Sequence, residues 1–133
     1  MIEWNDSMSV GVAEFDDHHK RIMALINKLE ASVQKGDDPG ITNEVLAEVS
    51  NYTVYHFFAE EEVMEKYAYP GYEQHRQEHI ALTSRAFQLM SDAQTGGAVL
   101  GQDVLTFLVG WLKNHILGTD KKYEPFFRDL GLS

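Results

Sequence analysis

Apolar and histidine positions recur at alternating spacings of three and four residues along most of the chain, as they do on one face of an α-helix. Four runs of this kind predict helices over residues 16–35, 42–67, 71–94 and 101–118. Asp16 or Asp17 would cap the first helix, and Thr42 or Asn43 the second, because short polar side chains there can accept from the free amides of the first turn.

The segments between and beside these runs predict turns, an arm and a short terminal helix. Turns are expected where glycine, proline and aspartate gather, at 36–40, 69–71 and 95–97. Residues 1–14 have no sustained helical period, so we expect an N-terminal arm, and the tail 119–133 predicts one short helix starting near Pro125. The anchors of the arm would be Trp4, Val10 and Val12.

Four amphipathic helices joined by short loops indicate an all-α fold. The expected architecture is an antiparallel up-down-up-down four-helix bundle with an N-terminal arm and a short C-terminal helix. At 133 residues the chain is long enough for one core, so we expect a single domain over residues 1–133.

Seven side chains that can bind metal interrupt the apolar stripes. Two pairs, His56 with Glu60 and His75 with His79, are spaced by four residues, which places each pair about one turn apart on one helix face. In such a bundle all seven fall at one end, where the first and third helices start and the second and fourth finish. The candidate ligands are His19, His56, Glu60, His75, His79, His115 and Asp120.

The spacing of five between His115 and Asp120 does not keep both on one face of a regular helix, because five residues rotate the direction by about 140°. We therefore expect irregular backbone near Gly118 and Thr119, which would turn Asp120 inward.

A single histidine in an apolar stripe is more often a hydrogen-bonded core residue than a ligand. Five of them with Glu60 are different, because burying each without a partner would cost about 1–3 kcal/mol and coordination removes that penalty.

His18 lies off the stripe and is expected at the rim. The remaining acidic residues are expected to form a solvated face, and the aromatic and isoleucine neighbours to be core or, beside a metal, pocket wall. The acidic residues of the solvated face are Glu61, Glu62, Glu65 and Glu78. The aromatic and isoleucine neighbours are Phe57, Phe58, Trp111 and Ile116.

Composition narrows the ligand chemistry and the partners. The chain has no cysteine, so a metal must be held by nitrogen and oxygen donors, which suit iron, zinc, copper or nickel. Two bridging carboxylates in a dry helix bundle favour a di-iron centre. The formal net charge of −10 disfavours binding to nucleic acid and to anionic membranes. The sequence has no secretion signal and no run long enough to span a membrane. We therefore expect a cytoplasmic protein that does not insert into membranes.

Counting donors predicts two unequal metal positions. If Glu60, Asp120 and a solvent-derived oxo or hydroxo group all bridge, the five histidines divide three and two. One iron is then saturated and the other has one vacancy, which suits a small diatomic molecule.

Several motifs resemble the hemerythrin family, over nearly the whole chain. They are FDDHHK at 15–20, HFFAEEEVM at 56–64, YPGYEQHRQEH at 69–79 and WLKNHILGTDKKY at 111–123. The resemblance implies one iron held by three histidines, His75, His79 and His115, and another by His19 and His56. Glu60 and Asp120 would bridge the two, with an oxo or hydroxo group between them. Dioxygen would bind at the open iron, and both irons would go from ferrous to ferric as it binds. The implied pocket wall is Ile22, Phe57, Trp111, Leu112 and Ile116. His18 stands where many relatives have glutamine.

The first functional hypothesis is reversible dioxygen binding for carriage, storage or delivery inside a bacterial cell. We expect a monomeric, stand-alone protein that is not an enzyme. Its partner would be an oxygen-consuming client enzyme that it supplies with dioxygen. The alternatives are a di-iron oxidase, peroxidase or nitric oxide reductase, and an oxygen- or redox-sensing module. Oxygen-activating di-iron bundles are richer in carboxylates, so five histidines disfavour the enzyme reading.

Overall fold

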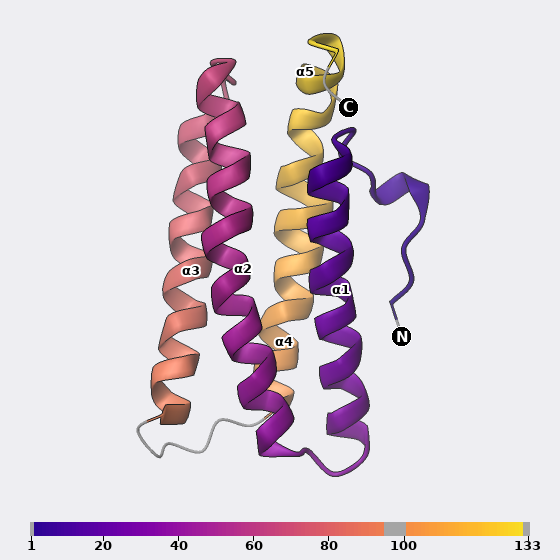
Figure 1. Ribbon diagram of the computed structural model, residues 1–133, viewed down its shortest axis with the longest axis vertical. Helices are drawn as coiled ribbons and strands as arrows, with labels where there is room; N and C mark the ends of the chain where they lie inside the picture. The colour runs from indigo at the N-terminus through magenta and orange to yellow at the C-terminus, as the bar shows by residue number, and fades with distance from the viewer. Residues whose placement is uncertain (1, 95–100, 132–133) are drawn as a thin grey trace.

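Four long helices stand side by side in the computed structural model, which describes residues 2–94 and 101–131. Successive helices point in opposite directions, giving the predicted up-down-up-down bundle (Figure 1). The described residues form no strand. The long helices are α1 (Ala13–Gln34), α2 (Pro39–Lys66), α3 (Tyr72–Gln94) and α4 (Gly101–Trp111). The predicted turn at 95–97 lies outside the described residues.

The chain does not leave the helical direction at the end of α4. It continues as a π-helix, η2 (Leu112–Thr119), then as a 3-10 turn, η3 (Asp120–Tyr123), and ends in the short helix α5 (Glu124–Asp129). The expectation of irregular backbone near Gly118 is confirmed, and so is the short helix near Pro125. In Figure 1, α5 lies at the end of the bundle where α1 begins.

Both predicted N-caps are wrong, each for a local chemical reason. Helix α2 starts at Pro39, and Asp38 caps it by accepting from the Gly40 amide at 2.8 Å. An aspartate followed by proline at the first helical position is a favourable start, so this part of the predicted turn belongs to the helix. Thr42 is already inside α2 and buried.

Helix α1 starts at Ala13, after Val12, which makes no side-chain cap. Asp16 instead holds the arm that leads into the helix. Its carboxylate accepts from the Val10 amide at 2.8 Å and from the Ser9 hydroxyl at 2.6 Å. The expected capping residue is therefore used one turn into the helix to fix the chain that precedes it.

The N-terminal arm is fastened along α1. The Ile2 amide donates to Asn27 Oδ1 at 2.8 Å, and Asn27 Nδ2 donates back to the Ile2 carbonyl at 2.7 Å. Trp4 packs partly buried against the core, with Lys20 Nζ 5.0 Å from its ring centre, and Val10 is fully buried. These contacts agree with the predicted anchoring of the arm.

Buried apolar side chains form two clusters. The larger runs along the bundle axis and contains stripe residues of all four long helices, such as Ile26, Leu46, Leu89 and Leu108. The smaller closes the end where α5 lies, and its members are Val10, Phe15, Met64, Tyr123 and Phe127. Phe58 was expected in the core, but it is 68% exposed because its position on α2 faces away from the other helices.

No helix in the described part of the chain is both long enough and apolar enough to cross a membrane.

Replacing Phe127 with alanine should lower the free energy of unfolding by about 3–5 kcal/mol, because it empties a fully buried site in the smaller cluster. Phe58→Ala, the matched control on an exposed site, should change it by less than about 0.5 kcal/mol. Urea denaturation followed by far-ultraviolet circular dichroism measures both. Equal losses in the two variants would contradict the assignment of α5 to the packed end of the bundle.

Candidate metal centre

All seven predicted ligands meet, buried, at the end of the bundle where α1 begins. His19 comes from the first turns of α1, and the others come from the end of α2, the start of α3 and the segment after α4. The convergence expected from the bundle topology is therefore present. The full set is His19 on α1, His56 and Glu60 on α2, His75 and His79 on α3, His115 on η2 and Asp120 on η3.

The π-helix η2 solves the spacing problem between His115 and Asp120. Its wider turn, with hydrogen bonds from residue i to i+5, brings side chains five residues apart back to nearly the same face. His115 Nε2 consequently lies 3.2 Å from Asp120 Oδ1. A regular α-helix would direct the two side chains apart.

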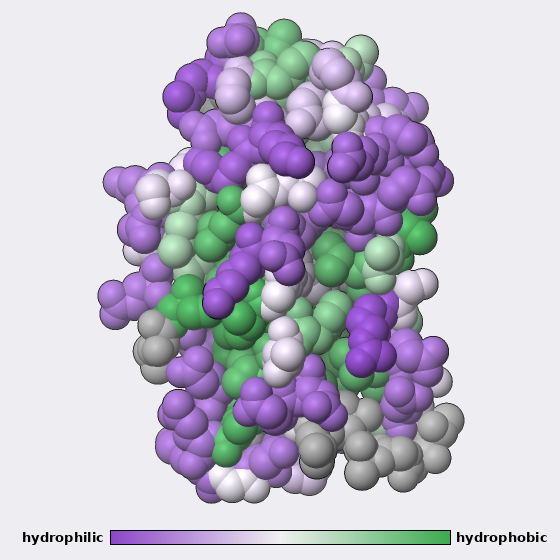
Figure 2. Space-filling view, turned by 180° about the vertical axis from the view of Figure 1, so that it is seen from behind, coloured by the Kyte–Doolittle hydropathy of each residue, from purple (hydrophilic) through white to green (hydrophobic). Residues whose placement is uncertain are grey.

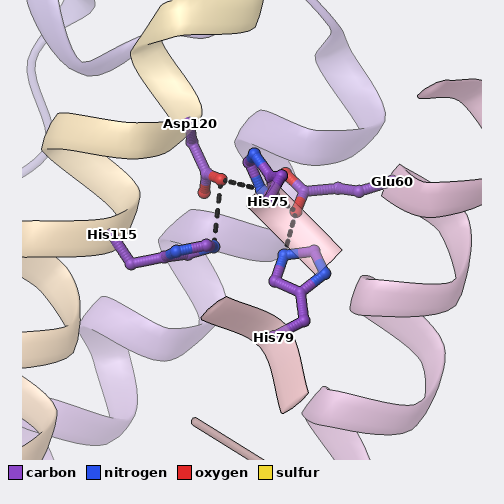
Figure 3. A group of neighbouring side chains, drawn as sticks. All are labelled: Glu60, His75, His79, His115 and Asp120. Atoms are coloured by element: carbon purple, nitrogen blue, oxygen red, sulfur yellow. Dashed lines mark ion pairs between the residues drawn. The ribbon is translucent and has the colours of Figure 1, made fainter. Parts of the chain in front are cut away.

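The ligand atoms form two groups that share both carboxylates. In each group one atom per residue lies within 4.8 Å of all the others. The first group has three imidazoles and is drawn in Figure 3, where the rings and the two carboxylates point toward one another. Its members are Glu60, His75, His79, His115 and Asp120, and those of the second group are His19, His56, Glu60 and Asp120.

Asp120 links the two groups through its two oxygens. Oδ1 lies 2.8 Å from His75 Nε2, within the first group. Oδ2 lies 3.0 Å from His19 Nε2, within the second. Neighbouring donors around an octahedral ion with bonds of about 2.1 Å lie about 3.0 Å apart, so these separations suit shared coordination.

Glu60 has a comparable position between the groups. Oε1 lies 3.1 Å from His79 Nε2 and 3.4 Å from His56 Nε2, and Oε2 lies 3.8 Å from His19 Nε2. Both carboxylates are fully buried.

The facing atoms are close together, yet they do not satisfy one another. Among the described residues, the Nε2 atoms of all five histidines, Oε1 of Glu60 and both oxygens of Asp120 have no hydrogen-bond partner. These atoms face a common space, and within each group they lie within 4.8 Å of one another. Five imidazoles and two carboxylates are the donors expected for first-row transition metals, so the residues fit a pair of metal ions.

The electrostatics of this cluster also favour positive charge. Burial opposes ionisation of Glu60, but His56, His75 and His79 outweigh it and hold its pKa well below the usual value. Burial and Glu60 raise the pKa of Asp120, and His115 and His19 more than reverse this, so that it too is strongly lowered. Burial lowers the pKa of His75, but the two carboxylates raise it to about 10. Without a cation the two carboxylates therefore keep a proton on His75, which a metal ion would replace. Burial instead lowers the pKa of His56 and outweighs the effect of Glu60 on that ring.

Two glutamates expected on a solvated face are part of the centre instead. Glu61 Oε2 lies 2.8 Å from His79 Nδ1, and Glu78 Oε1 lies 3.0 Å from His115 Nδ1. With a proton on Nδ1, each ring donates to its glutamate and turns the Nε2 lone pair inward, as metal-binding histidines commonly do. Glu62 and Glu65 are exposed, as predicted.

Tyr123 also belongs to the candidate site, although its place in the sequence does not predict this. Its hydroxyl donates to Glu60 Oε2 at 2.5 Å, and the ring is fully buried. Burial and the carboxylates Glu60 and Asp120 raise the pKa of Tyr123 well above its usual value, so the hydroxyl keeps its proton and remains a donor. The available signal was an aromatic residue with a polar tip three positions after Asp120.

The residues expected to form a pocket wall are all buried in the larger apolar cluster beside the ligands. Phe57 stacks on His79, with ring centres 3.8 Å apart and planes at 5°, and Trp111 lies 5.5 Å from Phe57. Tyr52, another residue of this cluster, stacks on His56 at 4.6 Å. The other three expected wall residues are Ile22, Leu112 and Ile116.

Apolar surface also reaches the outside of the molecule. The face seen in Figure 2 shows apolar side chains along the middle of the bundle between hydrophilic ones. Between α3 and α4 lies a groove of about 390 Å³ lined by Leu82, Phe107 and Trp111, and it borders His115 and Glu78.

Comparison with known proteins places the chain in a family. A family model described as the hemerythrin HHE cation binding domain matches residues 10–127. A bacteriohemerythrin of Methylococcus capsulatus is 36% identical over 117 residues, which cover 88% of this chain and 87% of the relative. A bacteriohemerythrin of Stenotrophomonas maltophilia is 32% identical over 123 residues, covering 92% and 79% respectively.

Solved structures give the same answer for the fold. A crystal structure of wild-type hemerythrin superimposes with a TM-score of 0.84 at 32% identity, covering 94% of this chain and 96% of that one. The four-helix bundle is thereby confirmed, as is the resemblance to the hemerythrin family. This chain belongs to the hemerythrin family.

Proposed function

We propose that the protein binds dioxygen reversibly at a non-haem di-iron centre held by the seven converging residues. The observation that carries the proposal is the inequality of the two ligand groups, which share both carboxylates but contain three imidazoles on one side and two on the other. With an oxo or hydroxo bridge, the side of His19 and His56 is one donor short of six. That side is where an external ligand would bind.

Each iron, when bound, would supply one electron to dioxygen and recover it on release. The protein's own residues have other tasks. Tyr123 fixes Glu60 between the two groups, and Glu61 and Glu78 fix the rings of His79 and His115.

The apolar wall protects the site. Ile22, Phe57, Trp111, Leu112 and Ile116 are each no more than 4% exposed, so water and protons that would drive irreversible oxidation are kept out.

The physiological role we propose is oxygen carriage, storage or delivery in the bacterial cytoplasm, by a monomeric single-domain protein that serves an oxygen-consuming client enzyme and is not itself an enzyme. Support comes from the histidine-rich ligand set, since oxygen-activating bundles carry more carboxylates. The relatives from Methylococcus and Stenotrophomonas are both named bacteriohemerythrins.

The iron-loaded protein, reduced without air, should develop a visible charge-transfer band on exposure to oxygen and lose it on flushing with inert gas, over several cycles. Absorption spectroscopy measures this directly. Immediate formation of ferric protein without a reversible band would exclude the carrier function. Turnover with peroxide or nitric oxide would then support the di-iron enzyme alternative, and an oxygen- or redox-sensing module would be the remaining one.

Glu60→Ala should reduce bound iron from about two per chain to less than about half of that, because Glu60 belongs to both ligand groups and its loss weakens both. Metal analysis after gel filtration measures the ratio. The exposed Glu62→Ala is the matched control on the same helix and should keep the full iron content. Equal iron content in the two variants would refute the shared role of Glu60.

Tyr123→Phe should lower the free energy of unfolding of the metal-free protein by about 1.5–3 kcal/mol, because a buried hydrogen bond to a charged carboxylate is lost. Tyr72→Phe removes a longer, exposed contact to Glu65 and should change stability by less than about 0.5 kcal/mol. Urea denaturation of both variants tests the difference. An unchanged Tyr123→Phe variant would show that the hydroxyl does not hold Glu60.

A further inference from the structure

His18 forms a hydrogen bond with the outer nitrogen of His56. The two Nδ1 atoms lie 2.7 Å apart, and the rings meet edge to face with centres 4.8 Å apart and planes at 85°. The His18 side chain is 18% exposed, and its Nε2 lies 4.0 Å from Glu14 Oε1 at the surface. At this separation one of the two Nδ1 atoms has to donate a proton to the other.

The direction of this hydrogen bond follows from the site. His56 Nε2 is buried, has no hydrogen-bond partner among the described residues, and faces Glu60 Oε1 at 3.4 Å. To offer a lone pair to a metal ion, the neutral ring must carry its proton on Nδ1. His56 is then the donor, and His18 is a neutral acceptor with its own proton on Nε2, toward Glu14.

This arrangement differs from that of two of the three histidines in the other group, the third being His75, whose Nδ1 has no hydrogen-bond partner among the described residues. His79 and His115 donate to the carboxylates Glu61 and Glu78, whereas His56 donates to an uncharged ring. A carboxylate acceptor draws the proton more strongly and makes the imidazole a stronger electron donor to metal. Among the described residues, His19 Nδ1 has no hydrogen-bond partner, so neither histidine of the two-histidine group has a carboxylate behind it.

We propose that His18 is a positioning residue that orients His56 and, as an uncharged acceptor, keeps the two-histidine metal position poorer in electrons than the three-histidine one. The position that is one ligand short is thereby also the stronger Lewis acid. Both differences direct an external ligand to the same side. This inference rests on the proposed di-iron function.

Four substitutions distinguish three effects of His18: the orientation of His56, the electron donation of His56 to the metal, and the charge near the site. His18→Gln keeps an uncharged acceptor, His18→Glu provides a carboxylate, and His18→Leu removes the acceptor. Arg21→Gln is the control for charge, because it makes the same helix more negative by one while its side chain contacts Glu48 at the surface. The probe is sodium azide, titrated into the iron-loaded ferric proteins and followed by visible absorption, with iron content determined in parallel.

His18→Gln and Arg21→Gln should bind azide within about twofold of the unsubstituted protein, because neither changes the type of acceptor behind His56. His18→Glu should weaken azide binding about tenfold, and His18→Leu should lose iron from the two-histidine position, in line with the usual effect of removing such partners. Equal weakening by His18→Glu and Arg21→Gln would overturn the proposal, since charge alone would explain both. Full iron content with unchanged azide affinity in His18→Leu would overturn it as well.

Failure of the proposed function can be distinguished from failure of this inference. If the unsubstituted protein takes up no iron, the di-iron function is wrong. The zinc-loaded protein, labelled with nitrogen-15 in histidine, then tests the hydrogen bond by itself. A protonated Nδ1 on His56 and an unprotonated Nδ1 on His18 would support the arrangement, and the reverse assignment would overturn it.

Discussion

The constraint on which the structure depends is the burial of two ionised carboxylates, Glu60 and Asp120, among five imidazoles whose inner nitrogens have no hydrogen-bond partners in the described part of the chain. An isolated buried carboxylate is very unfavourable, and two of them side by side are worse. Only positive charge at the centre removes the penalty. The packing at this end of the bundle can therefore be understood as a means of holding a charged cluster in place around cations.

The surrounding elements serve that constraint in different ways. The long helices α1, α2 and α3 fix the directions of five ligands through their backbones. The π-helix η2 carries the sixth, His115, and brings the seventh, Asp120, back to the same side. A second ring of hydrogen bonds, from Tyr123, Glu61, Glu78 and His18, fixes the orientation of side chains that the backbone alone would leave free to rotate. The smaller apolar cluster of Phe15, Met64, Phe127 and their neighbours covers the centre from the end of the bundle.

Whether a feature could be predicted from the sequence depends on how far apart in the chain the interacting residues lie. Helical periodicity and the topology of a bundle are enough to bring the seven ligands to one end, and the spacing of His115 and Asp120 was enough to predict irregular backbone. The helix starts were mistaken because Asp38 and Asp16 can serve either a turn or a cap, and local pattern does not decide between them. Glu61 and Glu78 were assigned to the surface because their contacts depend on how α2, α3 and η2 are rotated about their axes, which linear spacing does not specify. The exposure of Phe58 has the same origin.

Asp120 directs one oxygen to His19 near the start of the bundle's first helix and the other to His75 and His115. The ligands of either metal position thus come from segments distant in the chain, and no hairpin of two neighbouring helices contains a complete set. Assembly of the centre consequently requires long-range contacts, because the first helix and the segment after the fourth must meet before the cluster exists. Metal occupancy reports on the closure of the whole bundle rather than on the formation of any one helix.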